Sequence, residues 1–391
     1  MRIDSRLAER IRKVNPSSTL AITSKAKKLK AEGKDIISLA AGEPDFDTPD
    51  FIKDAAIEAI HSGFTKYTPT TGIPELKSAI CEKFKKENGL DYAPSQIIVS
   101  NGAKHSIFNV IQVLVNRGDE VLIPHPFWVS YPEMVTICEG KSVFIKSEAS
   151  NSFKITPKDL KKHISSKTKV LILNSPSNPT GCVYSRDELS EIAEICVKSK
   201  IYVISDEIYE KIIFDGLKHF SLAGFSKDIY GFTITVNGLS KSYSMTGWRI
   251  GYLGAPEEIS SAISNLQDHS TSNPASICQK AALAALKAPD DFARRICQEF
   301  ERRRNYVCSR LDKIPKLSYV KPQGAFYLFF NISKTKLDSL TVANRLLDEA
   351  LIAVIPGEGF GRKDYCRMSF ATSMELLEKS LNRLEEWLNK I

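Results

Sequence analysis

The chain has 391 residues, of which 42% are hydrophobic and 26% charged, a composition typical of a globular protein with room for two packed lobes. Its net charge of +8, from 54 basic and 46 acidic residues, is a small surplus that does not favour a nucleic-acid partner. No apolar stretch is long enough to span a bilayer and no signal-peptide pattern opens the chain, so no membrane partner is expected. The eight cysteines form no CxxC pair and do not cluster with histidines, which argues against a metal site and is typical of a cytoplasmic enzyme.

Short apolar runs alternate with amphipathic stretches between about residues 50 and 255. The predicted strands lie at 97–99, 120–123, 143–145, 169–173, 201–204 and 232–236. The predicted helices between them include 103–115 and 187–198. Strands this short and apolar, separated by helices, predict an α/β fold with a mainly parallel sheet that is covered on both faces.

The C-terminal part follows a different pattern. A long helical stretch at 275–312 precedes short strands near 317–320, 325–328 and 366–370, which predicts a smaller α+β lobe. Residues 1–48 are expected to join this lobe, because the core strands begin only later. We therefore predict a large domain at 49–290, a small domain at 291–391 together with 1–48, and a pocket between them.

In parallel sheets ligands bind beyond the carboxyl ends of the strands, so residues that follow the strands are candidates for a binding site. After 97–99, Gly102 precedes a helix whose first N–H groups, at Ala103 and Lys104, offer a site for an anion. The alternative there is a plain turn with a helix cap. After 120–123, Trp128 follows two prolines and is placed to stack on a flat ring, or else packs within its loop.

The next two strand ends carry polar side chains. Asn178 follows 169–173 in a loop with two X-Pro bonds, which indicate fixed turns and allow cis peptides. Asp206 follows 201–204 and suits pairing with a protonated ring nitrogen, the alternative being a helix cap. Tyr209, three residues farther on, is a candidate donor to a phenolate oxygen.

The last strand end carries the most informative residue, Lys241. It lies between Ser240 and a run of hydroxyl residues, eight positions before Arg249. Burial readily lowers the pKa of a lysine, so Lys241 can act as nucleophile and base while Ser240 and Arg249 bind a phosphate. A surface lysine in a polar loop is the alternative. The five strand ends together supply what pyridoxal phosphate needs for binding.

On these residues the chain resembles the class I, fold-type I aminotransferases along essentially its whole length. The segments that carry the resemblance are 41–46, 66–67, 72–76, 174–181, 205–209, 240–251 and Arg367. Within the family the chain is most similar to the bacterial and plastid-type aspartate aminotransferases, subgroup 1b. The resemblance implies a large domain with a seven-stranded, mainly parallel sheet that binds pyridoxal 5'-phosphate, and a smaller α+β domain.

The resemblance also implies roles for individual residues. The cofactor would be held by Ala103, Lys104, Trp128, Asn178, Asp206, Tyr209, Ser240, Lys241 and Arg249. The substrate would be held by Gly42, Lys104, Trp128, Asn178 and Arg367, the last binding the α-carboxylate in the bidentate manner that only arginine offers. Lys241 would be the catalytic residue that links to the cofactor and moves the substrate proton. Tyr67 would reach the phosphate of the neighbouring subunit, which implies a homodimer.

The implied reaction is ping-pong amino transfer between L-aspartate and 2-oxoglutarate. Segment 269–274 lacks the arginine that binds the second carboxylate in the animal-type enzymes, which leaves Lys104 as the candidate. The alternative place for Lys104 is at the phosphate. Relatives that use prephenate have a basic residue before a Pro-Ser-x-Thr segment. Here Thr19 is kept but Asn15 stands before the segment, which argues against prephenate.

Other functions fit the same pattern of residues. An aminotransferase for prephenate, aromatic amino acids or alanine would use the same cofactor site, and a carbon–sulfur lyase would use the same carbanion to expel a β-substituent. A transcription regulator built on this fold would need an added helix-turn-helix domain, for which the first 40 residues are too short. A binding protein without cofactor is the remaining class.

Overall fold

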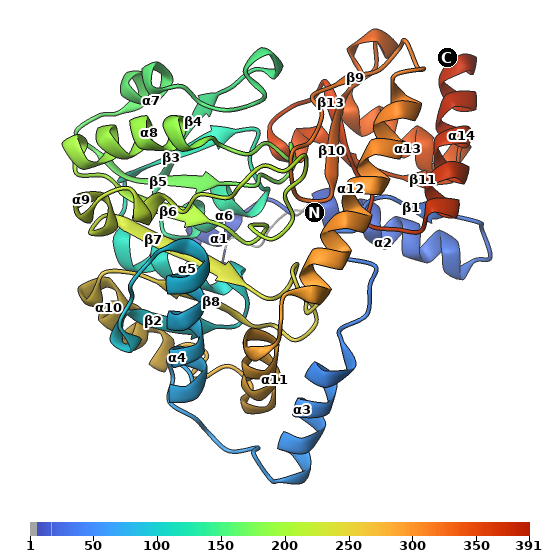
Figure 1. Ribbon diagram of the computed structural model, residues 1–391. Coiled ribbons are helices and arrows are strands. Elements are labelled where there is room, and N and C mark those ends of the chain that lie inside the picture. Colours follow the sequence, from blue (N-terminus) through green and yellow to red (C-terminus); the bar gives the residue numbers. More distant parts are fainter. Residues whose placement is uncertain (1–5, 17) are drawn as a thin grey trace.

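The computed structural model describes residues 6–16 and 18–391, and the side chains of 18–20 fall outside that description. Within the described residues, seven strands form the sheet of the larger lobe, in the order β2-β8-β7-β6-β5-β3-β4 (Figure 1). The strands are β2 Ile97–Ser100, β3 Glu120–His125, β4 Lys141–Lys146, β5 Thr168–Asn174, β6 Tyr202–Asp206, β7 Thr233–Gly238 and β8 Gly251–Gly254. Strands β4, β3, β5, β6 and β7 are parallel, whereas β8 is antiparallel to both of its neighbours, β2 and β7.

Helices cover both faces of this sheet, as the continuous apolar strands predict. In β5, Val170 and Ile172 pack toward one layer while Leu171 and Leu173 pack toward the other, because successive side chains of a strand point to opposite faces. One layer contains α5 Ala103–Leu114, α6 Ser130–Ile137 and α10 Glu257–Asp268. The other contains α7 Pro157–His163, α8 Arg186–Ser199 and α9 Lys227–Tyr230. The mainly parallel, doubly covered sheet is therefore confirmed.

Three further helices pack at the β2 end of the sheet. They are α3 Asp50–His61, α4 Pro74–Lys83 and α11 Ser276–Lys287, and they share an apolar core with β2 and β8. Helix α3 lies at the bottom of Figure 1, at the outer edge of this core, and packs against α11.

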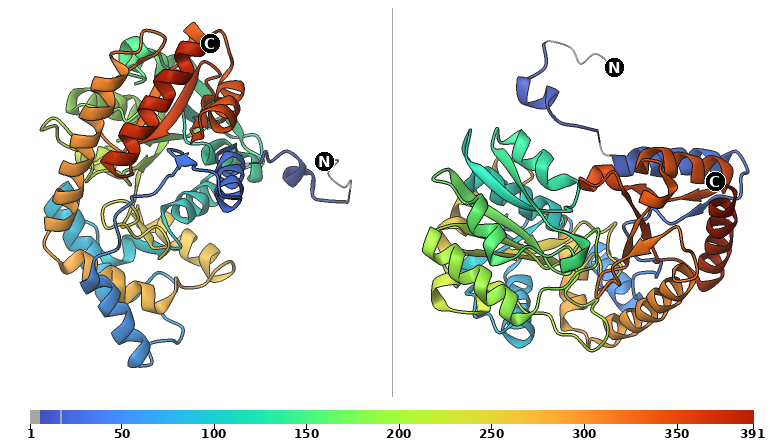
Figure 2. Two further views of the ribbon diagram at one scale, coloured as in Figure 1. Left: turned by 90° about the vertical axis from the view of Figure 1, so that its right-hand side faces the viewer. Right: turned by 90° about the horizontal axis from the view of Figure 1, so that it is seen from above.

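The smaller lobe joins the two ends of the chain. Its elements are α2 Ser18–Ala31, β1 Ile37–Ser38, α12 Asp291–Leu311, β9 Ser318–Tyr319, β10 Tyr327–Asn331, α13 Ser339–Glu349, β11 Ile352–Ala353, β12 Ile355–Pro356, β13 Tyr365–Ser369 and α14 Met374–Lys390. An antiparallel sheet β12-β13-β10-β9 supplies part of its core, and β1 pairs in parallel with β11. Figure 2 shows α2 beside the C-terminal elements, while the short helix α1 Glu9–Arg12 extends beyond the lobe. The smaller domain is thus confirmed, and the exact boundaries at 48/49 and 290/291 stay a prediction.

The prediction of one long helical stretch at 275–312 was wrong in one respect, because the chain forms two helices there, α11 and α12. Pro289 lies between the two helices, and Ala288 before it has an extended backbone with φ −77° and ψ 154°. A residue that precedes proline is disfavoured in the helical region, so the chain turns there. Helix α12 then runs from the larger lobe into the smaller one (Figure 1).

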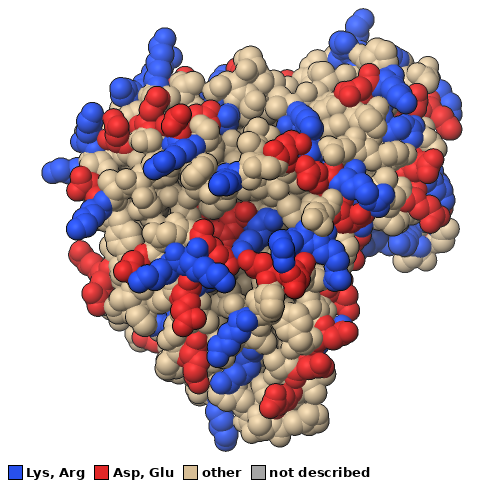
Figure 3. All heavy atoms as spheres, in the orientation of Figure 1, with Lys and Arg blue, Asp and Glu red and all other residues tan. Residues whose placement is uncertain are grey.

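Charged side chains of both signs are mixed over the face of the molecule in Figure 3. On that face the net charge of +8 does not gather into one basic patch. No helix within the described residues is both long enough and apolar enough to cross a membrane.

Candidate active site

A cleft with a volume of about 820 Å³ lies between the lobes, beyond the carboxyl ends of β5, β6 and β7. All but one of the predicted site residues line it: Gly42, Ala103, Lys104, Trp128, Asn178, Asp206, Tyr209, Ser240, Lys241, Arg249 and Arg367. The residue that does not line it is Tyr67, whose side chain is on the surface. The topology of a parallel sheet therefore brings the separate strand ends to one place.

Lys241 lies in the turn that follows β7. Its Nζ donates a hydrogen bond to the carbonyl oxygen of Gly42 at 2.5 Å, which joins the larger lobe to the N-terminal segment. Burial lowers the pKa of Lys241 to about 8, with Glu43 opposing the shift and the charge of Arg249 adding to it. A lysine with this pKa holds a useful fraction of neutral amine near physiological pH.

Asp206 ends β6 and is buried among the strand ends. Its carboxylate accepts a hydrogen bond from the hydroxyl of Tyr131 at 2.6 Å and a longer one from the backbone N–H of Ile208 at 3.3 Å. Burial raises the pKa of Asp206 to about 6, against the effect of these hydrogen bonds. An ionised carboxylate at this position is shielded from water, so a cationic group that binds beside it would be stabilised.

The start of α5 and Arg249 form a site for an anion. Gly102 has φ +86°, a conformation that favours glycine, and a Cβ at this position would lie 2.5 Å from a guanidinium nitrogen of Arg249. Arg249 itself has φ +51° and donates hydrogen bonds to the carbonyl oxygens of Thr246 and Asn101 at 3.0 and 3.2 Å. The N-terminal N–H groups of a helix beside an arginine suit a phosphate.

Arg367, on β13, is buried without a carboxylate partner. It donates to the side-chain oxygen of Asn178 at 2.9 Å and to the carbonyl oxygen of Ala40 at 3.1 Å, and its Nε has no hydrogen-bond partner. The guanidinium lies 4.3 Å from the ring centroid of Tyr327, whose hydroxyl is 2.9 Å from that of Tyr209. A buried guanidinium with an unsatisfied N–H indicates a site for an external carboxylate.

Four cations of the cleft share this lack of counter-ions. Among the residues that the structure describes, none of Lys104, Lys241, Arg249 and Arg367 forms an ion pair. Burial and the nearby charge of Arg249 lower the pKa of Lys104, which lies 4.9 Å from the ring centroid of Trp128. The donor set therefore fits a ligand that carries a phosphate and carboxylates, and it fits pyridoxal phosphate together with an acidic substrate.

Comparison with known proteins agrees with this geometry. The profile of the family described as aminotransferase class I and II matches residues 34–384. The chain belongs to this family. It is an aminotransferase that uses pyridoxal 5'-phosphate, with amino acids and 2-oxo acids as its substrates.

Relatives of this aminotransferase match it along nearly the whole chain. An aspartate aminotransferase of Geobacillus stearothermophilus is 48% identical and covers 98% of this chain and 99% of its own length. A probable aspartate/prephenate aminotransferase of Aquifex aeolicus is 46% identical with the same coverage. The solved structure of the Thermus thermophilus aspartate aminotransferase with maleate has a TM-score of 0.94 and 40% identity, covering 98% of this chain and 100% of that one. The full-length match confirms the predicted fold type I.

Sequence reasoning missed several residues of the cleft. Tyr131 and Tyr327 contact the predicted residues directly, and Glu43 accepts a hydrogen bond from Thr246 at 3.0 Å. Tyr327 lay in a predicted strand, but nothing in the sequence pattern of that strand indicated that its hydroxyl would contact the cleft residues. Asn15 donates its backbone N–H and its side-chain amide to the carboxylate of Glu133 at 2.9 and 3.2 Å. The side chain of Thr19 lies outside the described residues.

A buried polar cluster lies next to Asp206 and includes the one potential metal-ligand group found in the described residues. Glu207, Glu210 and His219 bring ligand atoms within 4.8 Å of one another. Glu207 already accepts from His219 Nε2 at 2.8 Å, and Glu210 forms an ion pair with Lys83. These internal partners account for the cluster, which we interpret as structural support for the end of β6.

Proposed function

We propose that the enzyme transfers the amino group between L-aspartate and 2-oxoglutarate, giving oxaloacetate and L-glutamate by a ping-pong mechanism. The observation that carries this proposal is the set of cleft cations without counter-ions. Arg249 suits the cofactor phosphate and Arg367 the α-carboxylate. Lys104, which lies beside Trp128, is our candidate for a second carboxylate, although Lys27 and Lys30 of α2 also line the cleft. The names of the bacillus relative and of the maleate-bound structure, both aspartate aminotransferases, support the same choice.

We assign the cofactor contacts as follows. Lys241 would form the covalent link, Asp206 would pair with the ring nitrogen, Trp128 would lie against the ring, and Asn178 and Tyr209 would bond the ring oxygen. The phosphate is held by Ser240, Arg249 and the backbone N–H groups of Ala103 and Lys104. When bound, pyridoxal phosphate supplies the electron sink that stabilises a carbanion at the substrate α-carbon.

The chain itself supplies binding and proton transfer. Arg367 binds the α-carboxylate, and the backbone of Gly42 lies beside the same site. The amine of Lys241 would take the proton from the substrate α-carbon as a base and return it as an acid. Its lowered pKa suits this exchange near neutral pH. Asp206, as an anion, would keep the ring nitrogen of the cofactor protonated.

An amino-donor panel tests the proposal. The purified enzyme is given aspartate, alanine, phenylalanine or cystathionine with 2-oxoglutarate, and kcat/KM is measured for each. We expect aspartate to exceed alanine and phenylalanine by at least about tenfold, the effect of one charged contact. Equal values for aspartate and alanine would refute the aspartate assignment. Pyruvate formed from cystathionine without an acceptor would identify a carbon–sulfur lyase instead.

Prephenate is a second candidate substrate, because several relatives are named aspartate/prephenate aminotransferases. In this chain Asn15 stands where those enzymes are expected to have a basic residue, and its amide is engaged with Glu133. We therefore expect prephenate to be a poorer amino acceptor than oxaloacetate. The same panel with prephenate as acceptor decides this point.

We also propose that the enzyme acts as a homodimer in which Tyr67 reaches the neighbouring cleft. Tyr67 is 93% exposed, and α3 carries the exposed apolar side chains of Phe51, Ile57 and Ile60. An exposed tyrosine and an exposed apolar helix face in one chain are the features expected where a second copy of the chain binds.

The free thiols of all eight cysteines support a reducing compartment, and we place the enzyme in the cytoplasm.

Mixing two inactive variants tests the shared site. Tyr67→Ala and Lys241→Ala each impair both sites of their own dimers. In a mixed dimer one site combines an intact Lys241 with an intact Tyr67 from the other chain. Recovery of activity on mixing supports the arrangement, whereas no recovery in a demonstrated mixed dimer contradicts it.

A further inference from the structure

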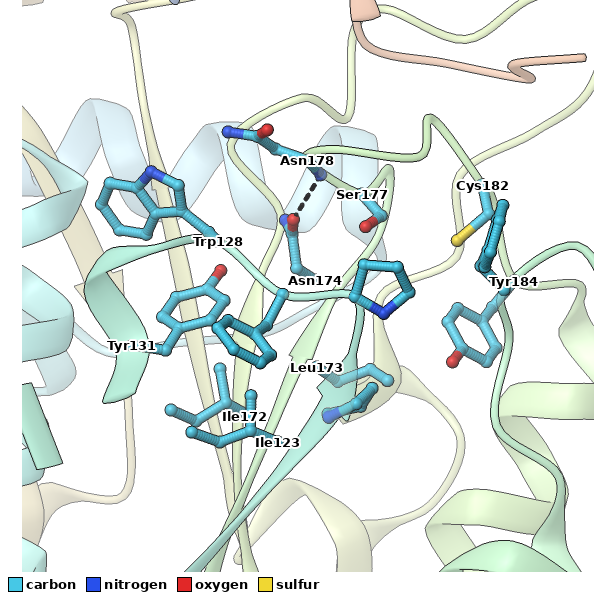
Figure 4. A pocket seen from close by; sticks show the side chains of 14 residues that line it. Ile123, Trp128, Tyr131, Ile172, Leu173, Asn174, Ser177, Asn178, Cys182 and Tyr184 are labelled. Carbon is cyan, nitrogen blue, oxygen red and sulfur yellow. Dashed lines mark hydrogen bonds between the residues drawn. The ribbon is translucent and has the colours of Figure 1, made fainter. Parts of the chain in front are cut away.

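Tyr131 contacts two residues of the cofactor site at once. It lies in α6, is 2% exposed, and donates its hydroxyl to Asp206 at 2.6 Å. Its ring also packs edge-on against Trp128, with 5.3 Å between centroids and an interplanar angle of 84°. Figure 4 shows Tyr131 and Trp128 on the same side of a small pocket, with Tyr184 at the opposite side.

The hydroxyl of Tyr131 makes the shortest hydrogen bond to the Asp206 carboxylate. The N–H of Ile208 is farther away, at 3.3 Å, and Asn174 holds only the backbone oxygen of Asp206, at 2.9 Å. An O–H donor favours the ionised form of a buried carboxylate and fixes its rotamer. The orientation of this carboxylate therefore depends chiefly on Tyr131.

We propose that Tyr131 is a positioning residue of the cofactor site, which keeps the Asp206 carboxylate ionised and oriented and holds the indole of Trp128 in its plane. The proposal rests on the function proposed above, in which Asp206 pairs with the ring nitrogen. Tyr131 acts through these two residues and needs no contact with the substrate. The other ionisable groups that act on Asp206 are Glu207, Tyr209 and Lys241.

Tyr131→Phe removes the hydroxyl and keeps the ring. Tyr184→Phe is the matched control, because Tyr184 is also buried but its hydroxyl accepts from the N–H of Ile155 at 3.0 Å, away from Asp206. The affinity of each full-length apoprotein for pyridoxal phosphate is measured by quenching of tryptophan fluorescence between pH 5 and 8. We expect Tyr131→Phe to weaken binding by about tenfold at pH 7, the effect of one charge-assisted hydrogen bond.

The pH profile separates a positioning role from a structural one. Without the hydroxyl the neutral form of Asp206 is favoured, so the loss of cofactor affinity on acidification moves to higher pH by about one unit. We expect Tyr184→Phe to leave both the affinity and the profile unchanged. Equal effects of the two variants, or a lower melting temperature of Tyr131→Phe with unchanged affinity, would overturn the proposal.

A double-mutant cycle tests the route through Asp206. In the Asp206→Asn background we expect Tyr131→Phe to weaken cofactor binding by less than about twofold, because the carboxylate is already absent. A tenfold loss that persists in this background overturns the assigned route. These experiments measure cofactor binding, whereas the amino-donor panel measures substrate preference. A preference for a donor other than aspartate would refute the proposed function but would not affect the role proposed for Tyr131.

Discussion

The Nζ of Lys241 lies 2.5 Å from the carbonyl oxygen of Gly42, although the two residues are 199 positions apart in the chain. This hydrogen bond links the turn after β7 to the N-terminal segment that packs with the smaller lobe. It holds the ammonium form of Lys241 in the cleft, whereas burial favours the neutral amine. The hydrogen bond therefore fixes the position of Lys241 and favours its charged form, whereas burial favours its neutral form.

The pH dependence of cofactor capture follows from this balance. The amine must be neutral to attack an aldehyde, and burial lowers the pKa of Lys241 to about 8 from an ordinary value of 10.5. We expect the rate at which apoprotein captures pyridoxal phosphate to rise with pH and to level off above about 8. Stopped-flow absorbance of the bound cofactor measures this rate. A rate that still rises tenfold between pH 9 and 10 would indicate an ordinary exposed lysine.

The strand ends were predictable from the sequence, because apolar runs mark the buried strands and a parallel sheet gathers whatever follows them. Asp206, Asn178 and Lys241 were found in this way. Strand β8 was missed, since its short run Gly251–Gly254 contains two glycines and follows the Lys241 turn directly. The break between α11 and α12 could have been read from Pro289.

Contacts made across the fold were harder to predict. Tyr131 follows Trp128 by three residues, and nothing in that spacing shows that its hydroxyl bonds to Asp206 at the end of β6. Tyr327 belongs to a strand of the smaller lobe, so its contact with Tyr209 depends on how the lobes pack. Sequence patterns report local structure, whereas these pairs are set by tertiary packing.

Arg367→Lys tests the carboxylate site. Lysine keeps the charge but loses the planar pair of N–H donors, so binding of the α-carboxylate weakens. We expect kcat/KM to fall by about 100-fold, or about 3 kcal/mol, for aspartate and alanine alike. Steady-state kinetics with both donors measures this. A loss confined to aspartate would instead place Arg367 at the distal carboxylate.

Lys104→Ser tests the distal carboxylate. Loss of one charged contact should raise the KM for aspartate by about tenfold and that for alanine by less than about threefold. Lys27, which lines the same cleft from α2, provides a matched control in Lys27→Ser. Equal increases for both donors would assign Lys104 to the phosphate. An aspartate-specific loss in the control alone would move the site to α2.

Asp206→Asn tests the cost of burying the carboxylate. The native pKa is raised from 3.8 to about 6, so the stabilisation by the neutral form is complete below 3.8 and lost as the pH rises through 6. We expect the apoprotein variant to be more stable by about 1–3 kcal/mol at pH 8, and by less at pH 5. Urea unfolding at both pH values measures this. A variant that is less stable than the parent at pH 8 would contradict the account.

Lys241→Ala removes the amine on which the proposed chemistry depends. The purified variant and the parent are compared for aspartate–2-oxoglutarate transamination and for visible absorbance after addition of pyridoxal phosphate, with circular dichroism to confirm folding. We predict a folded variant whose turnover is lost almost completely and whose visible absorbance no longer matches the parent's. A folded variant with the parent's rate and spectrum would contradict the assignment of Lys241.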